Sequence, residues 1–575
     1  MGYKESRDSR RYLQRLKRLG KEQCLVPYTY NSPLERVMDI SSIVLIVAAI
    51  SLGIYFQSWP YFILLIAAAF LVFSVRGLFV QDDRTLIRIY GPLGRIRYLF
   101  EDTFRDKYLQ YFNESNTNGR PIPRIVRDYI YQKAKAIKPI ASFGTELDEF
   151  DFENTAQSHI LHRNFPGTVK KASYEVIIGE KRNDVRPFKV KNTINVSAMS
   201  YGSINWKAAE CISIGAKDVA YVNTGEGGYG PHGVAGNDTV FQIGTGKFGV
   251  GKEGVLNDGT PARFLDEAHL RNLVRSNDNI KMVQIKISQG AKPGLGGVLP
   301  GIKVTPEIAA VRKVEPGKTI ISPQQHAEFI AGTPKGSILK MLEFIKKVRK
   351  LTELPVGIKL CVGRLDEIDL FIEAMKETGE GPDAIQIDGA DGGTGAGENI
   401  FMNYVGFGSS FETISYLDRK LKEAGIRDNI TISGSGKLFT PAHAALAFAV
   451  GSDIVETARG VMLSLGCIQS LHCHTNECPT GITTNSKWRM HGIDIPEKST
   501  RVHHYLEGFH EDMLHLTEIL GHSDPRDITT QDIRIISHKN KFVRYFDEDP
   551  FRVYMPNAND FEDSIHDDLH KNLKS

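Results

Sequence analysis

The sequence predicts an α/β protein whose main domain is a closed (β/α)8 barrel, the TIM-barrel fold. From about residue 190, short β-branched runs that end in Gly, Ser or Asn alternate with segments long enough for a helix. This order is typical of parallel strands, and eight such runs favour a closed barrel over an open, doubly wound sheet. The eight predicted strands are Ile194–Ser200, Val219–Gly225, Met282–Ser288, Lys318–Pro323, Val356–Val362, Ala384–Ala390, Asn429–Gly436 and Ile454–Gly460.

A hydrophobic N-terminal segment precedes the barrel. Residues 1–37 are basic, and no charged residue occurs from Ile40 to Val75. A single helix of this length would measure about 54 Å against a hydrocarbon layer of roughly 30 Å, so the break at Gln57–Pro60 predicts a hairpin of two transmembrane helices within residues 38–80. Basic residues flank the hairpin on both sides and place both termini and the catalytic domain in the cytoplasm, which predicts a multi-pass protein of the cell (inner) membrane. The alternative is a buried hairpin of a soluble domain.

Three further regions complete the predicted domain organisation. Residues 81–185 are interpreted as a mostly helical adaptor, with a helix from Arg124 to Ile137. Residues 186–483 form the barrel and a cysteine-containing loop, and a Gly-rich insertion at about 226–281 is expected to cover the site. Residues 484–575 supply a helix around His503–Leu520 and a charged tail.

The composition is that of an ordinary globular enzyme, with 41% hydrophobic and 24% charged residues. The formal net charge of +3 is too small to indicate a nucleic-acid partner. Of only six cysteines, Cys24, Cys211 and Cys361 stand alone, which is typical of a protein from a reducing compartment and argues against disulfides.

The other three cysteines, Cys467, Cys473 and Cys478, lie together on one short segment and are followed by a proline. Three thiolates on one loop can hold an iron–sulfur cluster with three protein-bound irons, and the proline recurs in ferredoxin-type sequences. The spacing therefore favours an electron carrier. A zinc site that uses His472 or His474 as a fourth ligand, or a disulfide, remains an alternative.

Two segments fall where TIM barrels commonly hold phosphate, in the loops after the seventh and eighth strands. The first is Ser433-Gly-Ser-Gly-Lys437 and the second is Ala458-Arg-Gly460. Glycines let the backbone approach phosphate oxygens, and Lys437 or Arg459 adds positive charge. The segments predict a phosphate-bearing cofactor, with simple tight turns as the alternative. The predicted cofactor residues here are Gly434, Ser435, Gly436, Lys437, Ala458, Arg459 and Gly460.

Other predicted strand ends are also polar. An unpaired lysine is costly to bury, so Lys286 and Lys359, from the third and fifth predicted strands, favour an anionic ligand at a common mouth. Lys292 follows in a Gly-rich loop, and Arg312 either turns back toward the same place or is a solvated helix residue. The remaining polar or flexible strand-end residues are Ser197, Met199, Ser200, Asn223, Gln386 and Asp388.

Taken together, these motifs resemble the flavin-binding synthase domain of glutamate synthase. They occur in one order over residues 190–483, about half of the chain. The motifs that carry the resemblance are Ser197-Ala-Met-Ser-Tyr-Gly202, Asn223-Thr-Gly-Glu-Gly-Gly228, Lys286-Ile-Ser-Gln-Gly-Ala-Lys-Pro-Gly294, Asp391-Gly-Gly-Thr-Gly395, Ser433–Lys437 and the three cysteines with Cys473-His-Thr-Asn476.

The resemblance implies a barrel that binds FMN and a 3Fe-4S cluster and aminates 2-oxoglutarate with ammonia to glutamate, with electrons from an external donor such as a ferredoxin-like protein or a reductase subunit. It implies that the three cysteines hold the cluster. Met199, Ser200 and Asn223 would lie beside the flavin ring, and Lys286, Gln289, Lys292 and Arg312 would surround the 2-oxoglutarate. Glu226 would lie near the arriving ammonia. We group Lys359 with the substrate residues, and Gln386 and Asp388 with the cofactor residues.

The sequence also departs from the large enzymes of that family. It begins with charged residues rather than a nucleophilic cysteine, so we expect no glutaminase, and ammonia that is free or delivered by another chain. The loop after Lys292 reads Leu295-Gly-Gly-Val298, where the large enzymes usually carry Glu and Gln, and this loss of two polar side chains leaves the identity of the oxo acid open. The leading hypothesis is an oxidoreductase that makes glutamate or an N-substituted glutamate. The alternatives are a membrane-linked amino-acid dehydrogenase running in the oxidative direction, or a non-catalytic flavin and iron–sulfur electron-transfer subunit.

Overall fold

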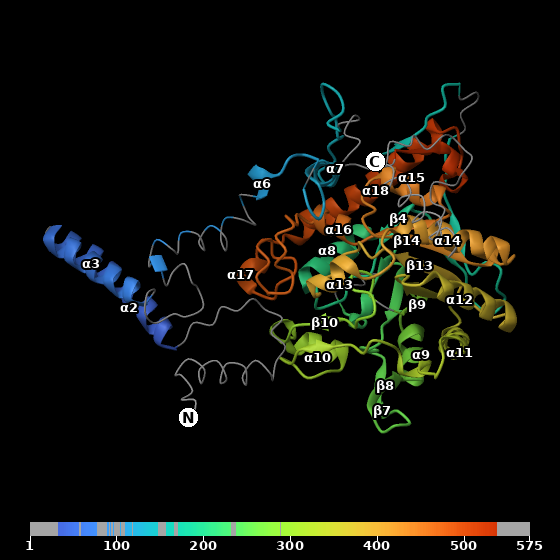
Figure 1. Cartoon of the computed structure of the whole chain (residues 1–575), viewed down its shortest axis with the longest axis horizontal. Coiled ribbons are helices and arrows are strands. Elements are labelled where there is room, and N and C mark those ends of the chain that lie inside the picture. Colours follow the sequence, from blue (N-terminus) through green and yellow to red (C-terminus); the bar gives the residue numbers. More distant parts are fainter. Residues whose placement is uncertain are drawn as a thin grey trace, which may run out of the picture. The chain divides into compact units, whose positions relative to one another are not determined.

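A computed structural model describes most of the chain (Figure 1). It describes residues 33–56, 59–76, 110–117, 119–147, 157–165, 171–231, 237–287 and 289–536, together with seven single residues between 89 and 108. The chain divides into two compact units. One comprises residues up to Ser115 together with Ile468–Leu471, and the other comprises the remainder, which contains the barrel.

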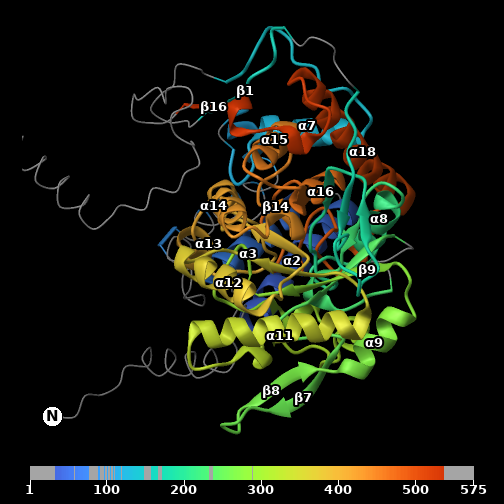
Figure 2. The same cartoon turned by 90° about the vertical axis from the view of Figure 1, so that its right-hand side faces the viewer.

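The second unit is built on a closed, eight-stranded parallel barrel, as predicted. Each strand pairs in parallel with its neighbours, and the pairing of β15 with β4 closes the barrel. Figures 1 and 2 show the strands at the centre with helices around them. The strands in chain order are β4 (Ile194–Val196), β5 (Val222–Asn223), β6 (Thr239–Ile243), β9 (Ile280–Lys286), β12 (Val356–Leu360), β13 (Ala384–Asp388), β14 (Thr431–Ser435) and β15 (Ile454–Thr457).

One of the eight predicted strands is wrong, and another replaces it. The run at Lys318–Pro323 contributes only β11 (Ile320–Ile321), which pairs antiparallel with β10 (Val298–Leu299) outside the barrel and leaves Ile321 57% exposed. The third barrel strand is instead β6, in the Gly-rich insertion, and all five of its residues are buried. Strand β9 is therefore the fourth strand of the barrel. The strands from β12 onward still have their predicted positions in the barrel order, because one strand was predicted in excess and one was missed before them.

Helices cover the outside of the barrel, and several begin with a Ser, Thr, Asn or Asp cap. Thr333 and Thr440 accept hydrogen bonds from backbone N–H groups at the starts of α11 and α15, each with a proline in the first turn. The helices of the second unit are α7 (Arg124–Ala134), α8 (Trp206–Ala216), α9 (Glu267–Arg275), α10 (Pro306–Arg312), α11 (Pro334–Thr352), α12 (Leu365–Thr378), α13 (Asn399–Tyr404), α14 (Ser410–Glu423), α15 (Pro441–Ala449), α16 (Arg459–Ser464), α17 (Lys487–Met490) and α18 (Ile495–Ile519).

Short sheets and a long helix surround this core. The hairpin of β7 (Gly251–Val255) and β8 (Pro261–Leu265) projects from the barrel in both views (Figures 1 and 2). Helices α18 and α8 pack closely against each other. Gly215 of α8 permits this approach, since a side chain there would clash with the backbone of Ser499 in α18. The predicted helices at Arg124–Ile137 and His503–Leu520 correspond to α7 and α18. The remaining strands form two antiparallel pairs, β1 (Gln157–Ile160) with β16 (Ile533–Ile536) and β2 (Val176–Ile178) with β3 (Phe188–Val190).

The β2–β3 pair covers the N-terminal end of the barrel. Arg182, which follows β2, donates to Asp383 at 2.6 Å, and the N–H of Arg186 donates to the carbonyl of Glu353 at 2.9 Å. Asp383 directly precedes β13 and also accepts from the N–H of Val356 at 2.7 Å. This end of the barrel is therefore closed, and the opposite end is left for a site.

The first unit contains α2 (Pro33–Phe56) and α3 (Trp59–Val75), which pack against each other, and the short α6 (Gln110–Asn113). Both predicted helices of the hairpin exist. However, none of the helices that the structure describes is long and apolar enough to span a bilayer. Helix α3 has 17 residues, a length of about 25 Å against roughly 30 Å of hydrocarbon. The first turns of α2 carry Glu35, Arg36 and Asp39.

The predicted transmembrane hairpin and the multi-pass location in the cell (inner) membrane are therefore wrong, and the membrane partner that was predicted from them is not supported. The uncharged run is long in sequence, but the break between α2 and α3 divides it into two pieces that are each too short. Most of the basic N-terminal segment, residues 1–32, and the charged tail after residue 536 lie outside the described residues.

Candidate active site

A row of amides crosses the interior of the barrel. The side chains of Asn223 and Gln242 both donate to Gln284 Oε1, at 2.8 and 2.7 Å. Gln284 donates in turn to Gln386 Oε1 at 3.0 Å, and Gln386 donates to the hydroxyls of Ser197 and Ser435 at 3.1 Å. Buried amides are stable only when paired in this way. The network fixes Asn223 and Gln386, two of the predicted cofactor residues, on a polar floor.

A lysine and a carboxylate meet above this floor. Lys286 Nζ, at the end of β9, donates to Gln289 Oε1 at 2.6 Å and lies 3.4 Å from Glu226 Oε1. Gln289 Nε2 donates to the same Glu226 oxygen at 2.9 Å. Burial opposes ionisation of Glu226, but Lys286, Gln289 and Arg312 outweigh it and lower the pKa of the carboxyl. Glu226 is therefore a buried carboxylate held by two predicted substrate residues.

Glycine is required beside this carboxylate. A Cβ at Gly297 would overlap Glu226 Oε1, and one at Gly244 would lie 2.7 Å from Glu226 Oε2. The Gly-rich insertion and the loop after β9 therefore both approach the site, as predicted for the insertion. Any larger side chain at Gly244 or Gly297 would therefore displace the Glu226 carboxylate.

Two charged groups in the site lack a full set of partners. Glu226 Oε2 is buried and accepts no hydrogen bond among the described residues. The side chain of Lys292 is 1% exposed and, within the described chain, makes neither a hydrogen bond nor an ion pair. Burial lowers the pKa of Lys292 to about 8, with Glu226 and Glu398 acting in the opposite direction. One unmatched cation and one unmatched carboxylate oxygen thus belong to the same group of residues.

The other two predicted cations are already engaged. Lys359 Nζ lies 2.9 Å from Asp388 Oδ2, and although burial disfavours the charged form of this lysine, Asp388 raises its pKa. The guanidinium of Arg312 donates to the Tyr201 carbonyl from both Nε and Nη2, at 3.2 and 2.7 Å, and lies over the Phe248 ring. Arg312 is buried in the site, not solvated, and burial lowers its pKa to about 10.

A second positive cluster forms where the phosphate loops were predicted. Burial lowers the pKa of Lys437 and of Arg459, and the Asp391 carboxylate acts on both in the opposite direction. Arg120 adds a third positive charge near Lys437. Gly436, at φ +114°, brings the backbone close to the Asp391 side chain, whose Oδ1 is buried without a partner. Three cations therefore lie near two carboxylates, Asp391 and Asp388, and the cations outnumber the carboxylates.

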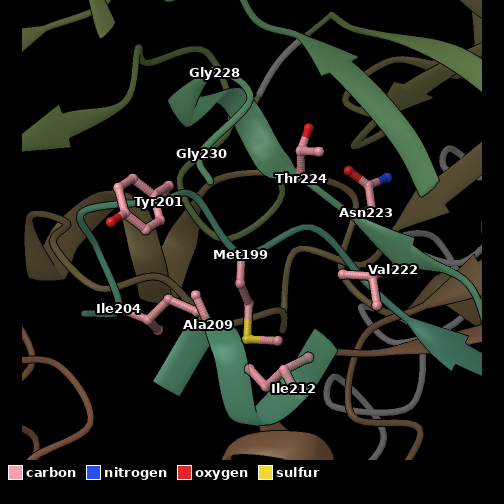
Figure 3. Close-up of a pocket in the computed structure, with 10 residues that line it drawn as sticks. All are labelled: Met199, Tyr201, Ile204, Ala209, Ile212, Val222, Asn223, Thr224, Gly228 and Gly230. Carbon is pink, nitrogen blue, oxygen red and sulfur yellow. The ribbon is translucent and has the colours of Figure 1, made fainter. Parts of the chain in front are cut away.

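Several predicted cofactor residues have packing roles. A Cβ at Gly434 would press on Ile414, and one at Gly460 would clash with the Tyr505 hydroxyl, so both glycines serve close contacts with helices. Ala458 is the residue before α16. In Figure 3 the side chain of Met199 points toward Ile212 of α8, away from Asn223 and Thr224.

The loops after β4 and β5 touch directly. A Cβ at Gly225, which has φ +64°, would clash with the backbone of Ser200, and the carbonyl of Ser200 accepts from the N–H of Ser203 at 2.9 Å. The loop that carries Ser200 and the loop that follows Asn223 therefore lie in contact.

The cysteine loop is held by two groups. Tyr131 of α7 donates to the Cys467 carbonyl at 2.6 Å. The buried Lys303 donates to the carbonyls of Cys473, at 3.2 Å, and of Ser203. Burial lowers the pKa of Lys303 to about 8, while Cys473 and Cys478 act to raise it. Lys303 thus joins the cysteine loop to the loop that carries Ser200.

The structure contains no disulfide among the five cysteines that it describes, including the three clustered ones. Burial raises the pKa of the Cys473 thiol, whereas hydrogen bonds from Thr480 and Thr483 outweigh burial and lower that of Cys478. Within the described residues no three His, Cys, Asp or Glu side chains are close enough to bind a metal ion. The structure therefore does not show a metal site at the three cysteines.

Sequence reasoning missed Lys303, Lys247 and His326. Each is a single residue in a loop, and its partner lies at least 40 positions away, so no local spacing marks it. Only a long-range contact map could have shown them.

The barrel and its charged mouth define a TIM-barrel enzyme, and comparison with known proteins identifies its family. The family described as "Conserved region in glutamate synthase" matches residues 132–523. The chain belongs to this glutamate synthase family. It is accordingly an oxidoreductase of the glutamate synthase type.

Named relatives agree with this assignment. The chain is 33% identical to the "Glutamate synthase large subunit-like protein YerD" of Bacillus subtilis over 77% of this chain and 88% of that protein. It is 30% identical to the "Archaeal glutamate synthase [NADPH]" of Methanocaldococcus jannaschii over 58% of this chain and 59% of that protein. It is 29% identical to the "Ferredoxin-dependent glutamate synthase" of Pyropia yezoensis over 59% of this chain but only 22% of that protein. The chain thus spans little more than half of the archaeal relative.

Proposed function

We propose that the chain reductively aminates a 2-oxo acid, 2-oxoglutarate, with ammonia to L-glutamate or an N-substituted glutamate. The observation that carries this proposal is the pair of unmatched charges at Lys292 and Glu226 Oε2. A 2-oxo acid brings carboxylates for the lysine, and ammonia or an imine brings N–H donors for the carboxylate oxygen. The printed names of the relatives support the same reaction.

The residues of the mouth divide this work. Lys292 and Lys286 neutralise substrate carboxylates, which makes the carbon that must accept hydride poorer in electrons. Glu226 accepts N–H donors through its free oxygen, and Gln289 holds the carboxylate and Lys286 in register. Arg312 donates to the Tyr201 carbonyl and holds that part of the backbone in place. Lys359 and Asp388 form an ion pair, so Lys359 is already neutralised within the protein.

FMN fits the second positive cluster. Its phosphate would be held by Lys437 and Arg459 with the Gly436 backbone, where cations exceed carboxylates. The partnerless Asp391 Oδ1 is suited to accept from a hydroxyl of a ribityl chain. Gln386 donates to Ser435 of the first phosphate loop and is linked through Gln284 to Asn223. When bound, FMN would supply the reducing equivalents to the substrate.

The three cysteines would hold a 3Fe-4S cluster. Three thiols on one loop are the donor set that such a cluster requires, and Cys478 lies close enough to Cys473 to raise its pKa. Lys303 supplies a buried positive charge beside these thiolates. An external electron donor, a ferredoxin-like protein or a reductase subunit, would then deliver electrons. The printed names of the relatives include both NADPH and ferredoxin.

The proposed reaction is tested with purified protein, 2-oxoglutarate, ammonium and a chemical reductant under anaerobic conditions. We expect L-glutamate to form in proportion to enzyme. Oxidation of glutamate that outpaces its formation would indicate the dehydrogenase direction. A protein that binds flavin but turns over no 2-oxo acid would be the electron-transfer subunit, and the synthase proposal would fall.

We expect the substitution Cys473→Ser to remove the iron–sulfur cluster and leave the flavin in place. A serine oxygen is a poor ligand for iron in such clusters, and one missing thiolate opens the three-ligand set. The measurement is iron content together with the electron paramagnetic resonance signal of the oxidised cluster, and flavin absorbance serves as the internal standard.

Cys211→Ser is the matched control, because Cys211 is a buried free thiol on α8 outside the loop. It should keep both iron and flavin. An unchanged cluster signal in Cys473→Ser would mean that the ligand assignment is mistaken. Zinc instead of iron in the wild-type protein would support the zinc alternative.

A further inference from the structure

A chain of three buried contacts ends on the backbone of Lys286. Lys247, in the Gly-rich insertion, has a fully buried side chain whose Nζ lies 2.7 Å from Glu328 Oε2 and 3.3 Å from His326 Nδ1. The other ring nitrogen, His326 Nε2, lies 2.9 Å from the Lys286 carbonyl oxygen. The histidine therefore stands between the insertion and the strand that carries a proposed catalytic lysine.

The chemistry of the neighbours fixes the tautomer of His326. An ammonium group only donates, so Nδ1 must accept from Lys247, and the proton must lie on Nε2. Nε2–H then donates to the carbonyl of Lys286, which accepts. Burial, and to a lesser extent the charge of Lys247, lowers the pKa of His326 to about 3, so the ring stays neutral in this arrangement.

This hydrogen bond holds the backbone at Lys286 itself. Lys286 is the last residue of β9, and its ammonium contacts Glu226 and Gln289. The position of the Lys286 backbone therefore decides where the ammonium lies. The next residues lead into the loop of Gln289 and Lys292. The Phe329 and Phe344 rings pack against the imidazole at 4.5 and 6.2 Å between centroids, which keeps the ring in place.

We propose that His326 is a positioning residue for Lys286: its Nε2–H holds the carbonyl at the end of β9, and Lys247 holds the imidazole in the tautomer that can do so. Neither residue needs to contact substrate. The proposal rests on the proposed function only in that turnover of 2-oxoglutarate is one of its readouts. A displacement of Lys286 by as little as 1 Å is expected to reduce the chemical step strongly.

The test compares three substitutions at His326. In His326→Gln the side-chain amide can reach the Lys286 carbonyl and donate, so kcat should stay within about threefold of wild type. In His326→Asn the amide is one carbon shorter, and in His326→Phe there is no donor, so both should lose at least tenfold in kcat. We expect KM for 2-oxoglutarate to change less than kcat, because Lys292 still binds the anion.

His443→Phe is the matched control, since His443 is also a buried histidine, on α15, that meets Thr440 rather than the site. It should leave kcat unchanged. Equal kcat values for the Gln, Asn and Phe variants would overturn the proposal. If His326→Phe does not fold, the contrast between Gln and Asn still decides the question.

The binding of 2-oxoglutarate, measured by calorimetry on the same variants, separates this proposal from the function itself. A wild-type protein without turnover would defeat the proposed reaction and leave the positioning role to be read from binding. In that case His326→Gln should bind like wild type, and His326→Asn should bind severalfold more weakly. Equal binding by both would overturn the positioning role.

Discussion

Replacement of Lys292 by methionine should lower kcat/KM for 2-oxoglutarate by roughly ten- to a hundredfold. Methionine keeps the length and apolar stem of the side chain but removes the one buried cation of the site that has no protein partner in the described chain. A charge-assisted hydrogen bond contributes roughly 1.5–3 kcal/mol, and the substrate carboxylate would be left in a buried place without it. Steady-state kinetics over a wide range of 2-oxoglutarate concentration measures the loss.

The same lysine gives a pH test. Its pKa is lowered to about 8, so the ammonium form that binds an anion is present below that pH and is lost as the pH rises through it. We expect the affinity for 2-oxoglutarate, measured by calorimetry without ammonium, to fall about tenfold per pH unit above pH 8. The Lys292→Met variant should bind weakly at every pH.

Lys318→Met is the control for these experiments, because Lys318 is an exposed lysine paired with an exposed glutamate. Its kinetics should match wild type. Full activity of Lys292→Met would mean that the mouth binds its substrate by other groups, and it would support the reading of the barrel as a non-catalytic electron-transfer subunit.

The second large effect concerns stability, at the closed end of the barrel. Arg349 of α11 has a side chain that is 2% exposed, and it binds Glu380 at 3.1 Å, Asp383 at 3.3 Å and the Gly381 carbonyl. Arg349→Met would leave Asp383 buried with only part of its partners. The loss of one member of a buried ion pair costs about 3–5 kcal/mol. The expected result is a clearly lower denaturant midpoint and a melting temperature lower by several degrees.

Lys346→Met provides the comparison, because Lys346 binds the same Glu380 at 2.9 Å from an exposed position. An exposed pair contributes about 0–1 kcal/mol, so this variant should unfold nearly like wild type. Equal stability of the two variants would show that the Asp383 cluster does not hold the end of the barrel together.

Much of this fold could be predicted because the pattern is local. The β-branched runs that end in small residues predicted β4, β5, β9, β12, β13, β14 and β15, and the rule for strand ends predicted Lys286, Lys359 and Asp388 as neighbours. Strand β6 was not found, because it lies within the Gly-rich insertion, which was interpreted as a loop. Ile320–Ile321 looked the same in sequence, but its partner, β10, lies outside the barrel.

The sequence indicated which residues belong to the site, but not which partners each of them contacts. Sequence placed Arg312 among the substrate residues, whereas the structure shows that its guanidinium is engaged by the Tyr201 carbonyl and Phe248. The roles of Gly434 and Gly460 depend on helices that are distant in sequence. The membrane prediction placed the two helices correctly but not their character: the first turns of α2 are charged and α3 has only 17 residues, so neither helix is both long and apolar enough to span a bilayer.

The amide row across the barrel floor runs in one direction, from Asn223 and Gln242 through Gln284 and Gln386 to Ser435. Each amide is oriented by its neighbour, so turning a single one would set two oxygens or two amino groups face to face. The hydroxyl of Ser435 donates to Asp388, and Asp388 forms an ion pair with Lys359. The network therefore extends from the amides to this ion pair. Opposite sides of the mouth are therefore not independent in redesign: a change of ligand preference made at Asn223 requires a compensating change near Asp388.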